Sequence, residues 1–325
     1  MKMIIRADDV GFTNVCNIGT FETFDKGLST AADVMLDSPG TVDALTRLRD
    51  YPWISVGWHA HMWCSPVLGA DKVPSLVEHG GEFDGRFRVD LRQAEDINFD
   101  EAVAELTAQL ELCKDVLGRY PDTGATPNGN KPWIKALEQV QLERNIPIRF
   151  ASRLASDPRN SSRILAGRER GEEWAFLYNP AGMHAGAAAP EWLDRNITVL
   201  DGGLAYIDLL TDSISDIEEN YDPVLYYTED RAGILNMPND SIVQQSWHPG
   251  WVDYFVYRLG ERFNRPRARQ FTVARCQDVA ALCDQRLFDW ICENKIELIN
   301  TKDALYGTNE YQEHLRDIGS DLCML

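Results

Sequence analysis

Five side chains in this sequence have types and spacings that suit metal binding or proton transfer, and the first two are adjacent. Asp8 and Asp9 end a strand-like run that begins almost at the start of the chain, and Gly11 follows them. Two neighbouring carboxylates repel each other, and a bound cation is one way to stabilise both charges. Because neighbouring residues on an extended chain point in opposite directions, one acid can hold a metal ion while the other faces a substrate. The alternative here is an Asp that caps a helix.

The next candidates are two histidines at the end of a second apolar run. His59 and His61 lie in the strand-like segment 54–63 and are separated by one residue. On a strand, this spacing places both imidazoles on one face, roughly 7 Å apart along the backbone, within reach of one ion. The alternative is that both rings pack against Trp58 and Trp63 as ordinary half-buried residues.

The fifth candidate is a histidine late in the chain. His248 ends the strand-like run 241–247, and Pro249-Gly250 then force a turn. A histidine held at such a corner can exchange protons near neutral pH. The alternative is a surface histidine in a tight turn.

The elements that must position these side chains alternate along the chain. The residue patterns predict helices at 14–26, 41–50, 99–117, 132–145 and 287–294, and strands at 30–36, 146–150, 197–200 and 296–299. Repeated β–α alternation predicts a mostly parallel sheet whose ligand site lies at the carboxyl ends of the strands. That rule would gather all five side chains on one face. In the helix at 99–117, we expect Glu101 and Glu105 to face water.

The length of 325 residues suits one α/β domain that spans 1–325. The segment near 64–98 is rich in Pro, Gly and charge, which predicts a functional loop over the strand ends. The segment near 151–195 is irregular, and we interpret it as an insertion that lines the pocket.

Composition excludes several classes of partner. The formal net charge of −19 disfavours nucleic acid and anionic membranes, because phosphates would be repelled. No apolar stretch approaches the roughly 18 residues that a membrane span needs. The first residues lack a signal sequence, and the seven cysteines contain no C-x-x-C pair. We therefore expect a cytoplasmic protein with free thiols, of which only Cys64 lies beside the histidine pair.

The segments 7–11, 56–61 and 248–250 occur in the order found in the YdjC-like carbohydrate deacetylases, a family that includes chitooligosaccharide deacetylases. The sequence resembles this family over nearly its whole length. The resemblance implies a distorted (β/α) barrel, a divalent metal ion such as Zn or Mg, and removal of an acetyl group from an N-acetylated amino sugar or oligosaccharide.

The resemblance also implies roles for individual residues. Asp9 and His59 would be metal ligands and Asp8 the general base. His248 would be a general acid or a contact to the substrate.

The chain departs from the family in one segment. The family usually supplies a further metal-binding histidine where this chain reads 121–130, and no histidine occurs there. His61 could fill this position, or Asp122 or Asn128 could contribute an oxygen, which would favour a harder ion than zinc. If the metal has been lost, the chain would be a sugar-binding or regulatory protein of the same fold. A further alternative is a metal-dependent hydrolase of phosphate esters. This activity would need more Lys or Arg residues around the strand ends than the motifs supply.

Residues near the motifs suggest a sugar ligand. Trp58, Trp63, Trp247 and Trp251 flank them, and flat rings stack well on the apolar face of a pyranose. The alternative for each tryptophan is that it packs in the core. We expect Trp63 and Trp251 to be the ones that contact the substrate. Arg149, at the end of a short strand, could bind a sugar or form a structural salt bridge. The expected partner is a carbohydrate substrate, and a homodimer is left open.

Overall fold

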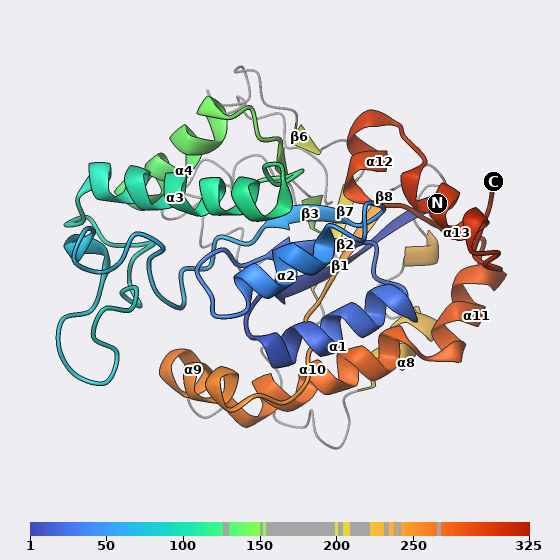
Figure 1. The fold of residues 1–325 in the computed structure, drawn as a ribbon. Helices are drawn as coiled ribbons and strands as arrows, with labels where there is room; N and C mark the ends of the chain where they lie inside the picture. Colours follow the sequence, from blue (N-terminus) through green and yellow to red (C-terminus); the bar gives the residue numbers. More distant parts are fainter. Residues whose placement is uncertain are drawn as a thin grey trace.

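The computed structural model of the chain describes residues 1–125, 130–149, 152–153, 199–200, 204–208, 222–230, 234–236, 239, 242–264 and 268–325. A parallel sheet lies at the centre of these residues, and helices pack around it (Figure 1). This arrangement confirms the predicted α/β class. The expected insertion at 151–195 lies almost wholly outside the described residues.

The main sheet has the strand order β3-β2-β1-β8-β7-β5, and its pairs are parallel. A further strand, β9, also pairs with β1, while β4 and β6 form a separate parallel pair. The described strands do not close into a barrel, so the confirmed part of the expected fold is the parallel α/β sheet. The strands are β1 Lys2–Val10, β2 Ala31–Val34, β3 Ser55–Trp58, β4 Ile148–Arg149, β5 Ser152–Arg153, β6 Val199–Leu200, β7 Leu204–Asp208, β8 Ile242–Trp247 and β9 Glu297–Leu298.

The first strand is central, and this position explains its sequence. It has neighbours on both sides, so nearly every residue is buried, and Met3, Ile4, Ile5, Ala7 and Val10 are apolar. Arg6, Asp8 and Asp9 are buried charged residues within the same strand. Its pairing with β2 shifts register between Ala7 and Val10. Within the shift, Asp9 adopts a left-handed backbone conformation with φ of 58°. Such a bulge redirects a side chain, so simple alternation does not describe how Asp8 and Asp9 are oriented.

The five helices predicted from the sequence are all present, with ends within a few residues of those expected. The patterns did not predict α8, α9, α10, α12 or α13. Helices α1 and α10 pack side by side below the sheet in Figure 1, and α3 packs on α4. The helices are α1 Asn14–Asp25, α2 Thr41–Leu48, α3 Phe99–Leu117, α4 Pro132–Glu143, α8 Pro223–Thr228, α9 Tyr254–Asn264, α10 Ala268–Leu282, α11 Gln285–Glu293, α12 Thr301–Tyr306 and α13 Glu310–Asp317.

The segment 64–98 contains one short 3-10 helix, Pro74–Leu76, and α3 fastens it. The carboxylate of Glu105 accepts hydrogen bonds from the backbone N–H groups of Val67 (2.9 Å) and Leu68 (3.1 Å). Glu101 accepts from Ser75 in the same way at 2.8 Å. The expectation that Glu105 faces water is wrong, because its side chain is fully buried as the acceptor for these loop amides.

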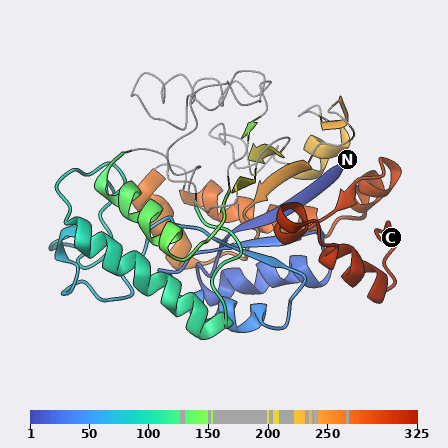
Figure 2. The same cartoon turned by 90° about the horizontal axis from the view of Figure 1, so that it is seen from above.

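The two chain termini lie on the same side of the molecule, as Figures 1 and 2 both show. Within the part of the chain that the structure describes, no helix has the length and apolar character needed to cross a membrane.

Candidate metal and proton-transfer site

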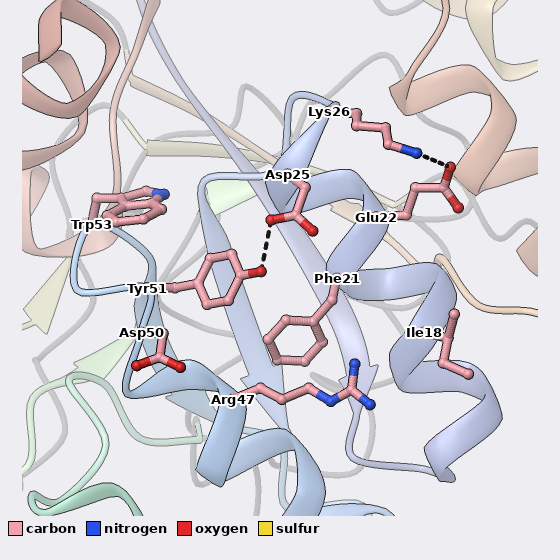
Figure 3. A pocket seen from close by; sticks show the side chains of 9 residues that line it. All are labelled: Ile18, Phe21, Glu22, Asp25, Lys26, Arg47, Asp50, Tyr51 and Trp53. Carbon is pink, nitrogen blue, oxygen red and sulfur yellow. Dashed lines mark hydrogen bonds and ion pairs between the residues drawn. The ribbon is translucent and has the colours of Figure 1, made fainter. Parts of the chain in front are cut away.

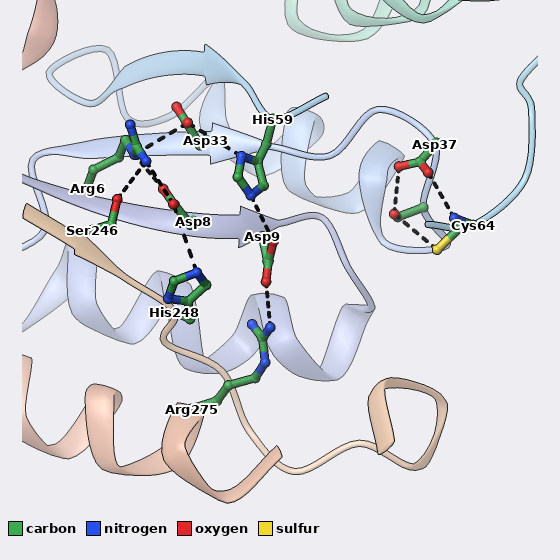
Figure 4. A network of polar contacts seen from close by, with 11 residues as sticks. Arg6, Asp8, Asp9, Asp33, Asp37, His59, Cys64, Ser246, His248 and Arg275 are labelled. Atoms are coloured by element: carbon green, nitrogen blue, oxygen red, sulfur yellow. Dashed lines mark hydrogen bonds and ion pairs between the residues drawn. The ribbon is translucent and has the colours of Figure 1, made fainter. Parts of the chain in front are cut away.

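The carboxyl ends of three strands bring the five candidate side chains together. Figure 4 shows four of them, Asp8, Asp9, His59 and His248. Asp8 and Asp9 lie near the end of β1, His59 and His61 follow β3, and His248 follows β8. His59 Nε2 lies 3.0 Å from Asp9 Oδ1, and His248 Nε2 lies 3.9 Å from Asp8 Oδ2. The predicted convergence at one edge of a parallel sheet is therefore present.

The two neighbouring histidines meet by a different route from the one expected. Strand β3 ends at Trp58, and the N–H of His61 donates to the carbonyl of His59 at 2.8 Å, which closes a three-residue turn. The ring centroids are 4.2 Å apart and meet edge to face. A tight turn, not strand alternation, thus brings the imidazoles together.

The donor atoms of Asp9, His59 and His61 fit a metal ion. One ligand atom from each lies within 4.8 Å of the others. Asp9 Oδ1 and His59 Nε2 are both buried and lie 3.0 Å apart as an ion pair, and neither atom has a hydrogen-bond partner among the other described residues. Buried polar atoms are nearly always satisfied. Two such atoms that face each other, with a second imidazole beside them, match the geometry of ligands that share an ion.

Two buried arginines neutralise part of the charge. Arg275 on α10 contacts Oδ2 of Asp9, the oxygen that faces away from His59. Arg6 contacts both oxygens of Asp8, with Nη2 2.8 Å from Oδ2. Burial alone would raise the pKa of each carboxyl group, but Arg275 and His59 hold the pKa of Asp9 well below its usual range. Arg6, with smaller help from His59, lowers the pKa of Asp8 in the same way.

The pKa values of the two imidazoles near Asp9 are shifted in opposite directions. Burial by itself would lower the pKa of His59, but the carboxylates of Asp8, Asp9 and Asp33 outweigh it and the pKa is raised. Burial, together with the positive charge of His59, lowers the pKa of His61 well below its usual range. His61 is therefore a neutral imidazole, the form that binds metals.

The corner that bears His248 is held from two sides. Its backbone N–H donates to Asp278 Oδ2 on α10 at 2.8 Å. On the α1 side, Thr20 donates to the carbonyl of Pro249 at 2.7 Å. A Cβ on Gly19 would lie 2.9 Å from the backbone carbon of Gly250, so only glycine lets the helix approach this closely. The imidazole is thus presented by a rigid turn.

The four tryptophans divide into two groups. Trp58 and Trp247 are fully buried and belong to the core, so the idea that they flank a sugar is wrong for them. Trp63 is half-buried, and its ring lies 4.4 Å from that of His61. Trp251 is half-buried beside α1. The backbone of Arg149 lies in β4, but its side chain is outside the described residues.

Sequence reasoning missed three charged residues that contact the site: Arg6, Asp33 and Arg275. Arg6 and Asp33 could have been recognised, because a charged residue within a buried strand usually has a charged or polar partner. Arg275 could not have been, because it meets Asp9 across 266 positions of the chain.

Other residues considered from the sequence lie apart from this cluster. Cys64 belongs to a separate buried group with Ser38 and Asp37, drawn to the right in Figure 4. Burial and the Asp37 carboxylate raise the pKa of the Cys64 thiol far above its usual range, so it is not a reactive thiolate. Asp122 accepts from the backbone N–H of Val56 at 2.7 Å. Asn128 lies outside the described residues.

An open groove between α1 and the end of α2 offers a contrasting surface (Figure 3). Its volume is about 570 Å³, and Tyr51 and Trp53 line part of it. Its polar groups already pair with one another: Tyr51 donates to Asp25 at 2.6 Å, and Lys26 to Glu22 at 3.2 Å. Nothing in these contacts points to a ligand.

The fold and the site together define a class: an α/β protein with a histidine–aspartate cluster at the carboxyl edge of a parallel sheet. The sequence matches the profile described as YdjC-like protein over residues 2–293. The chain belongs to the YdjC-like family, as its motifs predicted.

Two curated relatives and one solved structure place the chain within this group. A carbohydrate deacetylase of Geobacillus stearothermophilus is 37% identical over 126 residues, which cover 38% of this chain and 45% of that protein. One from Clostridium beijerinckii is 22% identical over 307 residues, covering 93% of this chain and 100% of that protein. A crystal structure of a protein from Enterococcus faecalis V583 shares the fold, with a TM-score of 0.62, 20% identity, and coverage of 94% and 98%. In the first alignment, the chain spans less than half the length of its relative.

Proposed function

We propose that this protein is a metal-dependent hydrolase that removes the acetyl group from an N-acetylated amino sugar or oligosaccharide. The observation that carries the proposal is the pair of buried ligand atoms on Asp9 and His59, which face each other without a further hydrogen-bond partner, with His61 beside them. The names of the curated relatives support a carbohydrate substrate.

Asp9, His59 and His61 would hold the ion. Two imidazoles and one carboxylate suit zinc or a similar transition metal better than Mg²⁺, which prefers an all-oxygen shell. A divalent ion bound there would act as a Lewis acid on the amide carbonyl and lower the pKa of a water molecule. Arg275 holds the second oxygen of Asp9, so it fixes the direction in which the first oxygen points.

His248 and Asp8 would carry out the proton transfers. The two-point contact with Arg6 keeps Asp8 ionised and makes it a weaker base than a free carboxylate. We therefore assign proton transfer to the departing amine to His248, which Asp8 orients from 3.9 Å. The general-base role of Asp8 stays a prediction. Trp63, beside His61, is placed to stack on a sugar ring.

The test is release of acetate from N-acetylglucosamine oligomers by the full chain, with Zn²⁺ added or removed by a chelator. We expect turnover that needs the metal and that falls at least about 100-fold in His248→Gln, within the range for general acid–base catalysis. Asp8→Asn should retain Zn²⁺ and also lose turnover, because Asp8 is the predicted general base.

Two outcomes would change the proposal. If Asp8→Asn kept full activity, the general-base role of Asp8 would be wrong. Tight oligosaccharide binding without any bound metal or acetate release would instead favour the metal-free sugar-binding alternative.

A further inference from the structure

Asp33 is a buried carboxylate in a place where a parallel sheet normally carries apolar side chains. It lies within β2, and its residue is only 1% exposed. Its Oδ2 atom lies 3.4 Å from Arg6 Nε and 3.7 Å from His59 Nδ1. Because burying a charge without partners is costly, these contacts show what the carboxylate faces.

The neighbouring strand makes room for this carboxylate. Gly57 on β3 is paired in register with Asp33. A Cβ at residue 57 would lie 2.0 Å from Asp33 Oδ1, a distance that real side chains do not tolerate. Even alanine at position 57 would therefore displace the Asp33 carboxylate. The backbone is built around an acid at position 33.

The imidazole of His59 lies between two carboxylates. Asp9 faces Nε2 at 3.0 Å, and Asp33 faces Nδ1 at 3.7 Å. A neutral imidazole has one proton, and a carboxylate on the Nδ1 side favours that proton there. The lone pair of Nε2 is then left for a metal ion, as in the carboxylate–histidine–zinc arrangement of many metal sites.

We propose that Asp33 is a positioning residue for the metal centre: its carboxylate charge, 3.7 Å from Nδ1 of His59, favours the proton on that nitrogen, so that the lone pair of Nε2 is directed at the ion. The proposal rests on the proposed function only in that this centre takes a divalent metal. Arg6 completes the arrangement, because it contacts Asp33 and Asp8 together and its Nη2 donates to Ser246 Oγ at 2.6 Å. One guanidinium thus ties β1, β2 and β8 together beneath the site.

The main test measures the affinity of the full chain for Zn²⁺ alone by calorimetry. Asp33→Asn keeps the shape of the side chain but removes its charge. We expect Zn²⁺ to bind about 10–100-fold more weakly, the usual loss for an outer partner of a metal ligand. The visible spectrum of the Co²⁺ form should change as well, since it reports the geometry around the ion.

The matched control is Asp122→Asn. Asp122 bonds to the backbone of β3 at Val56, on the same strand as Gly57, but is not part of the metal cluster. This variant should lower thermal stability and leave the Zn²⁺ affinity and the Co²⁺ spectrum unchanged. It therefore separates general damage to β3 from loss of positioning.

A double-mutant cycle with Gly57 tests whether the space serves the carboxylate. Gly57→Ala should weaken Zn²⁺ binding in the wild-type background, because the new methyl displaces Asp33. In the Asp33→Ala background it should add little, since the nearest remaining atom is Thr123 Oγ1 at 3.0 Å. Additive losses would overturn the role of Gly57 in holding Asp33.

The two proposals fail in different ways. If the wild-type chain binds no Zn²⁺, both are wrong. If it binds Zn²⁺ and Asp33→Asn binds equally well with an unchanged Co²⁺ spectrum, only the role of Asp33 is wrong. Should neither position-33 variant fold, Gly57→Ala alone decides: an unchanged Zn²⁺ affinity would overturn the proposal.

Discussion

The strand-end cluster and the groove beside Tyr51 both gather charged and aromatic side chains, but only the cluster has the marks of a site. In the groove, the Tyr51 hydroxyl and the Lys26 ammonium each meet a carboxylate, at a surface that water reaches. In the cluster, Asp9 Oδ1 and His59 Nε2 are buried and face only each other among the described residues. Buried ligand atoms with no further partner, more than the presence of a hollow, distinguish the candidate site from the groove.

The largest effect should come from breaking the buried ion pair between Arg275 and Asp9. Arg275→Met leaves one oxygen of Asp9 buried without its cation, which should cost about 3–5 kcal/mol of unfolding free energy. Lys26→Met, which breaks an exposed pair with Glu22 near the groove, should cost no more than about 1 kcal/mol. Urea denaturation of both variants measures the difference. Equal losses would remove the distinction between the two regions.

The next effect concerns metal affinity. Asp9→Asn keeps a residue that tolerates the left-handed backbone at this position but removes the charge. Zn²⁺ affinity should fall by more than about 100-fold, beyond the range for partners that do not touch the ion. Asp25→Asn in the groove should bind Zn²⁺ like the wild type. Calorimetry with both variants checks this, and normal binding by Asp9→Asn would exclude it as a ligand.

A third prediction contrasts two buried carboxylates with different partners. Asp9 faces a guanidinium, whereas Glu105 bonds to backbone amides and to Gln109, and burial raises its pKa. Glu105→Gln places an NH₂ group against these donors and should cost about 1–3 kcal/mol at neutral pH.

The pH dependence of that loss has a definite sign. Because the pKa of Glu105 is raised in the folded state, folding favours the protonated acid. The wild type should therefore gain stability relative to the variant as pH falls from neutral toward the ordinary value of 4.5. Denaturation curves at several pH values test this. If the difference in unfolding free energy between wild type and Glu105→Gln became smaller at lower pH, the raised pKa of Glu105 would be wrong.

The smallest effect should come from the groove itself. Tyr51→Phe removes a hydrogen bond to Asp25 whose partners are largely exposed, so the loss should be about 0.5–1 kcal/mol. Acetate release should not change. A clear drop in turnover would mean that the groove communicates with the strand-end cluster.

The sequence predicted the parts of this structure that depend on local pattern. The strands β1, β3 and β8 and the helix at 99–117 are periodic or apolar enough to recognise, and the parallel-sheet rule then brings the strand ends together. The YdjC-like motifs added the family, which the profile match confirms.

What could not be predicted depends on contacts between distant residues or on local backbone geometry. Arg275 lies on α10. The buried face of this helix includes the charged residues Arg275 and Asp278, so the sequence has no continuous apolar stripe that would predict the helix. The turn at His59 and the bulge at Asp9 are single-residue events without a sequence signature. Glu105 looked like a solvent-facing residue because its loop partners lie 37 and 38 positions away.

The missing side chain of Gly19 has a consequence for the two sides of the candidate site. Backbone packs directly on backbone where α1 meets Gly250, so a side chain at residue 19 would push the His248 corner away from the strand ends. On the other side, the segment after His61 is positioned by side chains, because carboxylates on α3 accept hydrogen bonds from its backbone. One side of the site therefore depends on the absence of a side chain, and the other depends on buried carboxylates.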